Sequence, residues 1–199
     1  MTLLQEKTAP LHGLIMPGGG SQRMPQGGTQ TEVCARLLRP HCEKIFLSVR
    51  ESVPTQPGLA ALEQLKDGYV NMGPLGGILT ALESNPACAW LIVTSQHPLL
   101  DEATLAFLVE NRAPLCHATA FRNPGDDQPE PLFAIYEPSA LAHFIELMDN
   151  GITLPSEMLL KSDIQLIDPP FLPSQLTLKT PEDAPQLLWW IKDKDRKSG

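Results

Sequence analysis

Short apolar runs alternate with amphipathic segments along the first half of the chain. Buried strands are predicted where apolar residues run together, at residues 11–16, 44–49 and 89–94, with a short strand at 69–70. Helices are predicted where apolar residues recur at helical spacing, at residues 29–38, 58–66, 76–83 and 101–111. Strands that alternate with helices indicate a three-layer, doubly wound α/β fold with a mostly parallel sheet covered on both faces.

The second half of the chain has a different order of predicted elements. A polar, turn-rich segment at residues 123–131 precedes three elements: a strand at 132–136, a helix at 139–148 and a strand at 164–167. Other helices are expected at residues 155–160 and after the capping sequence TPED at 180–183. Without a repeat or linker, we expect one domain over residues 1–199, ending in a flexible tail at 192–199.

Composition narrows the class of protein. The chain has 15 Lys and Arg against 23 Asp and Glu, a net charge of -8, which disfavours nucleic acid as a partner. No apolar run approaches the ~20 residues of a membrane-spanning helix, and the first ten residues lack the apolar core of a secretory signal. The four cysteines include no CxxC pair, which indicates free thiols and not disulfides or a zinc site. We therefore expect a cytoplasmic protein.

A glycine-rich loop directly after the first predicted strand is the strongest local signal. Residues 17–24 read PGGGSQRM, and backbone N–H groups of such a turn can approach a phosphate. Arg23 adds a cation able to form a bidentate contact. The spacing fits neither GxxxxGK[ST] nor GxGxxG. The loop therefore indicates either a phosphate site or a plain glycine turn.

Two further loops are expected at the same edge of the sheet. Residues 71–77 (NMGPLGG) precede a helix, and residues 94–98 (TSQHP) end the most apolar strand. In an open parallel sheet, ligands bind where the carboxyl ends of the strands meet. The alternative for the second loop is a turn with close helix packing.

Together these loops resemble those of molybdenum cofactor guanylyltransferases and, more loosely, of other nucleotidyltransferases. The first loop is similar to the family's LAGGxSxRMGxDK, with matches at Gly18, Gly19, Ser21, Arg23 and Met24. Residues 73–78 (GPLGGI) match the family's GPLxG, and residues 131–136 (PLFAIY) are similar to its PLFALY strand. The closing TPED also matches, so the resemblance extends over residues 11–184.

The resemblance implies transfer of GMP from GTP to molybdopterin, with release of pyrophosphate and use of Mg²⁺. It implies Arg23 as the catalytic residue. It also implies a nucleotide-binding set consisting of Gly18, Gly19, Gly20, Ser21, Asp67, Asn71, Gly73 and Pro74.

Several charged groups of the family pattern are missing. The Asp-Lys pair of the first motif falls on Gly27 and Gly28, and the magnesium-binding Asp falls on Gln96. The Asn-x-Asn before the last motif falls on residues 177–179 (TLK). An amide brings no charge to Mg²⁺, which favours carboxylates. We therefore assign no metal ligand and expect catalysis to be lost or greatly weakened, with Mg²⁺ used only if activity remains.

Two alternatives stay open at this point. Asp67, Asn71 or Asp101 can stand in for a missing family carboxylate. A non-catalytic role is the other alternative: a regulatory protein of cofactor metabolism that binds a nucleotide or a protein partner, through the old cleft or a surface near Trp189.

Overall fold

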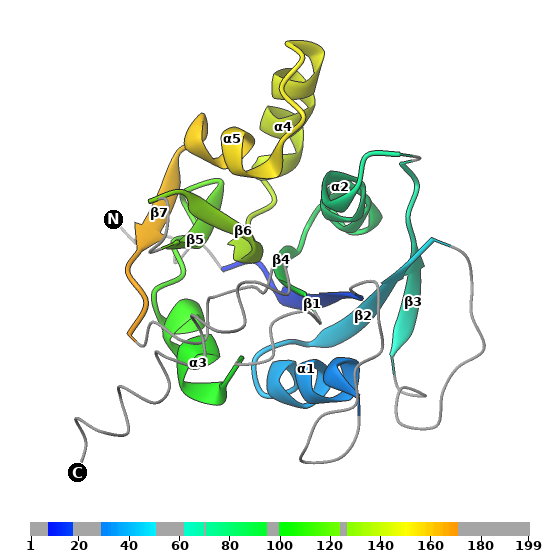
Figure 1. Cartoon of the computed structure of the whole chain (residues 1–199), viewed down its shortest axis with the longest axis vertical. Helices are drawn as coiled ribbons and strands as arrows, with labels where there is room; N and C mark the ends of the chain where they lie inside the picture. The colour runs from blue at the N-terminus through cyan, green and yellow to red at the C-terminus, as the bar shows by residue number, and fades with distance from the viewer. Residues whose placement is uncertain are drawn as a thin grey trace, which may run out of the picture.

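The computed structural model describes residues 8–17, 29–50, 62–69, 71–94, 100–123 and 127–170. Within them the strands form one seven-stranded sheet in the order β3-β2-β1-β4-β6-β5-β7 (Figure 1). The strands are β1 Leu11–Met16, β2 Lys44–Val49, β3 Glu63–Lys66, β4 Ala89–Thr94, β5 Ala118–Arg122, β6 Pro129–Tyr136 and β7 Ile164–Ile167. The helices are α1 Gln30–Leu38, α2 Pro74–Ser84, α3 Glu102–Glu110, α4 Ala140–Asp149 and α5 Pro155–Leu160.

The sheet is parallel except at one strand. β3, β2, β1 and β4 pair in parallel, as do β5 and β7. β6 runs antiparallel to both of its neighbours, β4 and β5. The carboxyl ends of the other strands therefore lie at one edge, and β6 begins at that edge. The expected mostly parallel sheet is confirmed.

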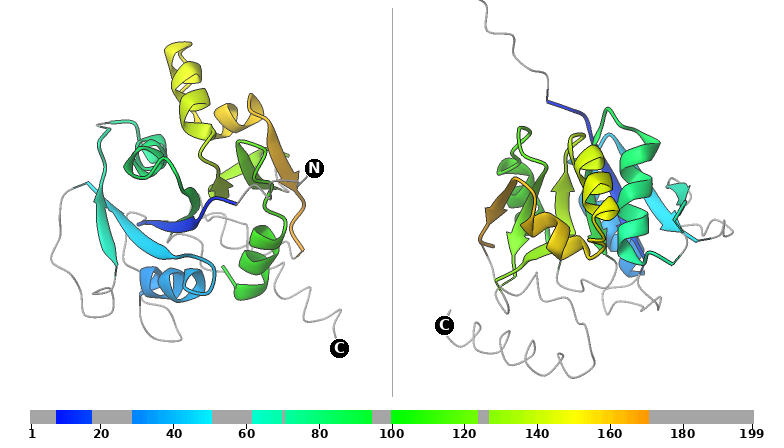
Figure 2. Two further views of the ribbon diagram at one scale, coloured as in Figure 1. Left: turned by 180° about the vertical axis from the view of Figure 1, so that it is seen from behind. Right: turned by 90° about the horizontal axis from the view of Figure 1, so that it is seen from above.

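Helices cover both faces of the sheet. α1 and α3 lie on one face, and α2, α4 and α5 lie on the other (Figures 1 and 2). β4 is buried along its whole length, so alternate residues serve two cores. Leu91 and Val93 pack in the α1 and α3 core, whereas Trp90 and Ile92 pack in the α2 and α4 core. This two-sided burial explains the continuous apolar run in the sequence.

Side-chain caps fix the starts of two predicted helices. At α1, Thr29 and Glu32 form a capping box, in which the Glu32 N–H donates to Thr29 Oγ1 at 3.3 Å. At α3, Asp101 accepts a hydrogen bond from the Thr104 N–H at 2.7 Å. The helices predicted at residues 29–38 and 101–111 are confirmed with ends shifted by one residue. Among the described residues, no helix combines the length and apolar character needed to traverse a bilayer.

Three short elements differ from the sequence prediction. Residues 63–66 were expected in a helix but form β3, which pairs with residues 46–49 of β2. Backbone pairing with a buried neighbour outweighs the helical pattern of these polar residues. Tyr69 lies in a bend after β3, so the strand expected at 69–70 is wrong at this residue; Val70 lies outside the described residues. β5 was not predicted at all.

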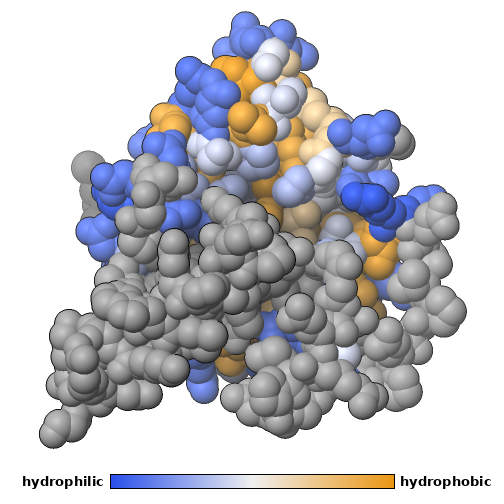
Figure 3. Space-filling model, viewed as in Figure 1, coloured by the Kyte–Doolittle hydropathy of each residue, from blue (hydrophilic) through white to orange (hydrophobic). Residues whose placement is uncertain are grey.

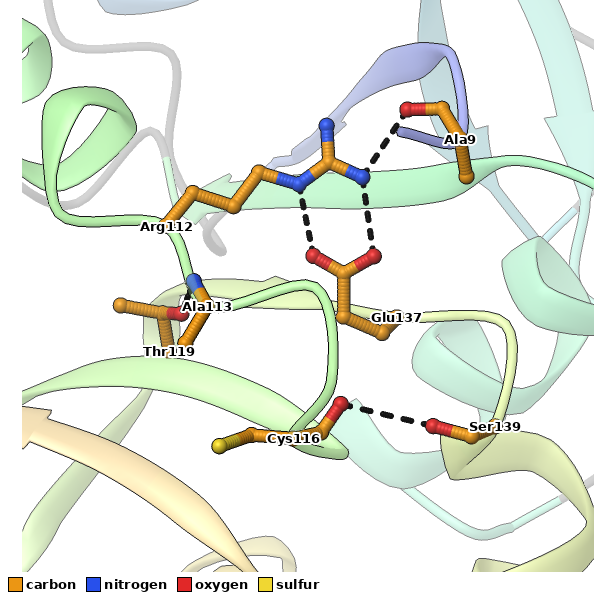
Figure 4. A network of polar contacts seen from close by, with 7 residues as sticks. All are labelled: Ala9, Arg112, Ala113, Cys116, Thr119, Glu137 and Ser139. Atoms are coloured by element: carbon orange, nitrogen blue, oxygen red, sulfur yellow. Dashed lines mark hydrogen bonds and ion pairs between the residues drawn. The ribbon is translucent and has the colours of Figure 1, made fainter. Parts of the chain in front are cut away.

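A buried ion pair joins three connections at the amino edge of the sheet. Arg112 donates to both carboxylate oxygens of Glu137, at 2.6 and 2.8 Å, and to the Ala9 carbonyl at 2.9 Å (Figure 4). The side chains of Arg112 and Glu137 are 11% and 1% exposed. The pair therefore ties the segment before β1 to those before β5 and after β6.

Apolar side chains also reach the surface. In Figure 3 they gather at the top of the molecule, over α4 and α5. Ile145 on α4, Leu160 on α5 and Leu154 between the two helices are the exposed large hydrophobic residues of this region.

Candidate functional site

The carboxyl edge of the sheet brings distant parts of the chain together. β1 ends there at Met16, β3 at Lys66 and β4 at Thr94. The antiparallel β6 begins at the same edge, because its last residue, Tyr136, pairs with Trp90 near the start of β4, whereas the earlier Phe133 pairs with Val93 near the end of β4. Ligands of open α/β sheets bind at such an edge.

Asp67 is the best-defined polar side chain at this edge. It follows β3 directly, and its N–H donates to the Val49 carbonyl at 2.8 Å, which continues the pairing with β2. Its Oδ1 accepts from the Tyr69 N–H at 2.9 Å and from the Thr80 hydroxyl at 3.3 Å. The carboxylate is thus held by its own loop and by α2.

Gly76 allows this carboxylate to lie against α2. A Cβ at Gly76 would be 2.8 Å from Asp67 Oδ1, 2.9 Å from Oδ2 and 3.1 Å from the Cβ of Tyr69. These distances are too short for any side chain larger than hydrogen. The contact places a negative charge at the first turn of α2, where the helix dipole favours it.

Gly77 allows the same helix, α2, to pack closely on the sheet. A Cβ at Gly77 would be 2.7 Å from Cε of Met16 and 3.4 Å from Oγ of Ser48. The backbone of α2 therefore packs directly on the ends of β1 and β2. Close helix packing, the alternative considered for this glycine cluster, accounts for Gly76 and Gly77.

A sharply turned loop leads into α2. Asn71 has φ 63° and Gly73 has φ 55°, a left-handed region in which glycine is unstrained. Pro74 occupies the first turn of α2, where its fixed φ suits the helix. Asn71, Gly73 and Pro74 are exposed, and no atom lies within 4 Å of a Cβ built on Gly73. The loop therefore offers open backbone beside the Asp67 carboxylate.

The structure places part of the predicted site. Asp67, Asn71 and Gly73 lie in the connection between β3 and α2, and Pro74 begins α2. The remaining predicted residues lie outside the described residues: Gly18, Gly19, Gly20, Ser21, Arg23 and Gln96. Their assignment stays a prediction, although Met16 and Thr94, which flank the two loops, both lie at the expected edge.

Sequence reasoning missed Glu130 at this edge. Glu130 lies at the start of β6, is only 6% exposed, and accepts from the Leu132 N–H at 3.1 Å. Burial raises the pKa of Tyr136 well above its usual value, and the charge of Glu130 raises it further. The Tyr136 hydroxyl donates to the Pro131 carbonyl at 2.8 Å. A signal was present, because an acidic residue between two prolines directly precedes a buried strand.

The described residues do not form a metal site. No three His, Cys, Asp or Glu side chains among them are grouped so as to hold an ion. Asp101, one of the carboxylates considered as a substitute metal ligand, is used to cap α3. The loop that contains Gln96 lies outside the described residues, and no chemical step is assigned to a metal.

Solved structures define the class of this fold: it is the fold of nucleotidyltransferases. A molybdopterin-guanine dinucleotide biosynthesis protein A from Archaeoglobus fulgidus has a TM-score of 0.63 at 19% identity, over 88% of this chain and 96% of that one. A 2-C-methyl-D-erythritol 4-phosphate cytidylyltransferase from Thermus thermophilus has a TM-score of 0.65 at 14% identity, over 89% and 95%.

Sequence comparison then gives the family. The chain belongs to the MobA-like NTP transferase domain family, whose family model matches residues 13–162. A molybdenum cofactor biosynthesis bifunctional protein of Synechocystis is 33% identical over an alignment of 186 residues, which covers 89% of this chain and 54% of the relative. A probable molybdenum cofactor guanylyltransferase of Chloroflexus aggregans is 27% identical over an alignment of 150 residues, which covers 67% of this chain and 70% of that one.

These comparisons confirm the family predicted from the loops. The chain spans about half the length of the Synechocystis relative.

Proposed function

We propose that this chain is a guanylyltransferase-like protein of molybdenum cofactor metabolism that binds GTP but transfers GMP to molybdopterin weakly or not at all. The observation that carries the proposal is the contact between Asp67 and Gly76 within the family's GPLGG loop. It puts a fixed carboxylate beside exposed loop backbone at the ligand edge of the sheet. We further propose a single cytoplasmic domain.

The two glycine loops would contact different parts of the nucleotide. Residues 18–21 would hold the triphosphate through backbone N–H groups, and Arg23 would supply the positive charge. Asp67 already offsets the dipole of α2, so this end suits hydrogen-bond donors better than phosphates. Guanine carries two adjacent N–H donors, which an acceptor-only carboxylate can bind. Asn71, Gly73 and Pro74 would line the same side of the site.

Weak catalysis follows from the charges that the sequence lacks. Phosphoryl chemistry depends on positioning and on electrostatic stabilisation of the developing charge. When bound, Mg²⁺ supplies part of that stabilisation, but Gln96 brings no charge to hold it. Gly27 and Gly28 replace the family's Asp and Lys, which leaves Arg23 as the cation of the first loop. The proposed protein keeps the groups that bind the nucleotide and lacks the charged groups that would stabilise the transfer of GMP.

Calorimetry with GTP, CTP and ATP, each with and without Mg²⁺, tests this proposal. We expect binding of GTP in preference to the other two, and little release of pyrophosphate when molybdopterin is added. Rapid Mg²⁺-dependent release would contradict the loss of catalysis. The absence of binding to all three nucleotides by the folded protein would contradict the nucleotide site.

The same charge losses favour a second candidate function, a non-catalytic regulatory protein that recognises a protein partner. Such a protein needs neither Gln96 nor Arg23 for chemistry. Failure to bind any nucleotide, in a sample whose circular dichroism and cooperative unfolding show an intact fold, would favour this alternative.

A further inference from the structure

We propose that Thr80 is a positioning residue that holds Asp67 and Gly68, in the loop before α2, in the geometry that binds nucleotide; this inference rests on the proposed function. Thr80 lies on α2, more than a turn beyond the loop. Its hydroxyl accepts a hydrogen bond from the Gly68 N–H at 3.0 Å and donates one to Asp67 Oδ1 at 3.3 Å. One side-chain oxygen therefore binds two successive residues of the loop.

The hydroxyl is used in both of its hydrogen-bonding roles. Asp67 Oδ1 receives two hydrogen bonds, from Thr80 and from the Tyr69 N–H, whereas no hydrogen bond to Oδ2 is formed by the described residues. Both of these hydrogen bonds go to Oδ1, so Oδ2 is the oxygen that we expect to bind the nucleotide. Thr80 thus contributes, with the Tyr69 N–H, to fixing which carboxylate oxygen the fold uses.

The other links between this loop and α2 cannot replace Thr80. The Tyr69 hydroxyl donates to Glu83 at 2.5 Å, but this pair is exposed and lies toward the far end of the helix. The contact between Asp67 and Gly76 is a packing contact without a hydrogen bond, so it does not orient the carboxylate oxygens. Without the Thr80 hydroxyl, Asp67 Oδ1 would keep only the hydrogen bond from the Tyr69 N–H of its own loop, and the Gly68 N–H would lose its partner on α2.

Three variants of the full chain separate positioning from stability. Thr80→Val keeps the branched shape and removes the hydroxyl, whereas Thr80→Ser keeps the hydroxyl. Ser84→Ala is the matched control, because its hydroxyl also lies on α2 but donates to the Ala81 carbonyl rather than to the loop. The readouts are the GTP dissociation constant by calorimetry and the exchange rate of the Gly68 amide hydrogen without nucleotide.

We expect Thr80→Val to weaken GTP binding by about three- to tenfold, the range for losing one hydrogen bond. Gly68 should exchange faster in this variant, Thr80→Ser should restore both properties, and Ser84→Ala should change neither. Unchanged exchange or unchanged affinity in Thr80→Val overturns the inference while leaving the proposed function standing. If the wild-type protein binds no GTP, the proposed function fails, and the inference fails with it even where Gly68 exchange responds.

Discussion

The carboxylate of Asp67 lies against the α carbon of Gly76, so that any Cβ at Gly76 would be 2.8 Å from Oδ1. The Gly76→Ala substitution should therefore displace the carboxylate. We expect a loss of stability of about 1–3 kcal/mol from overpacking, measured by urea unfolding, and weaker GTP binding by calorimetry.

Gly77→Ala is the control for this variant. Its Cβ would meet the flexible end of Met16, which can move aside, and alanine gains about 1 kcal/mol of helix propensity over glycine. Gly77→Ala should be close to neutral in stability and in GTP affinity. If Gly76→Ala and Gly77→Ala have the same stability and the same GTP affinity, the close approach of Asp67 to α2 is not needed for folding or for nucleotide binding.

Removing the charge of Asp67 should affect binding more than folding. Asp67→Asn keeps an oxygen that can accept from Tyr69 and Thr80, so the unfolding midpoint should change little. A carboxylate that binds ligand donors contributes a charge-assisted hydrogen bond, and its loss should weaken GTP binding about tenfold or more. Asp149→Asn, on α4, is the control. Equal GTP affinity in Asp67→Asn and wild type would remove Asp67 from the site.

The buried pair of Arg112 and Glu137 should stabilise the fold without touching the candidate site. Arg112→Ala leaves Glu137 buried without its partner, which should cost about 3–5 kcal/mol in the free energy of unfolding. Lys44→Ala, which breaks an exposed pair with Glu63, should cost about 1 kcal/mol or less. Urea titrations of the two variants compare these losses, and a similar small loss in both would contradict the structural role given to Arg112.

Acidic pH should destabilise the protein through two histidines, the buried His12 and the half-buried His117. Desolvation lowers the pKa of His12 and of His117 from 6.5, and the neighbouring His143 lowers the pKa of His117 further. The unfolded chain therefore binds more protons than the folded protein below about pH 6.5, and the stability held above that pH is lost as pH falls.

Urea unfolding between pH 7.5 and 5 measures this dependence. Because carboxylates also titrate toward pH 5, the diagnostic result is a shallower slope in His12→Gln and in His117→Gln than in wild type. The same slope in all three proteins would show that neither histidine carries the effect.

The sequence pattern predicted most elements because their apolar spacing reflects burial. β4 is apolar except at Thr94 and buried along its whole length, and Val33, Leu37 and Leu38 recur at helical spacing in α1, so both elements were found at nearly their observed ends. β3 was missed because residues 63–66 (EQLK) are largely polar and their strand character comes from pairing with β2. β5 is short and was missed because its burial depends on β6 and β7, which follow it in the chain.

The candidate site was predictable only in part. Gly73 and Pro74 are recognisable from local chemistry, since a turn with positive φ and a helix start favour these residues. The approach of Asp67 to Gly76 and the double hydrogen bond of Thr80 depend on how α2 lies over the sheet. Glu130 was missed because its burial at this edge follows from the reversed direction of β6.

The reversal of β6 has a consequence for how the ligand edge can diversify. β5 ends and β6 begins at the edge where Asp67 lies, whereas residues 137–139 connect β6 to α4 at the opposite edge. Insertions between β5 and β6 would therefore enlarge the carboxyl edge, and insertions between β6 and α4 would leave that edge unchanged. The carboxyl edge can thus change in shape while the strands and their cores stay as they are.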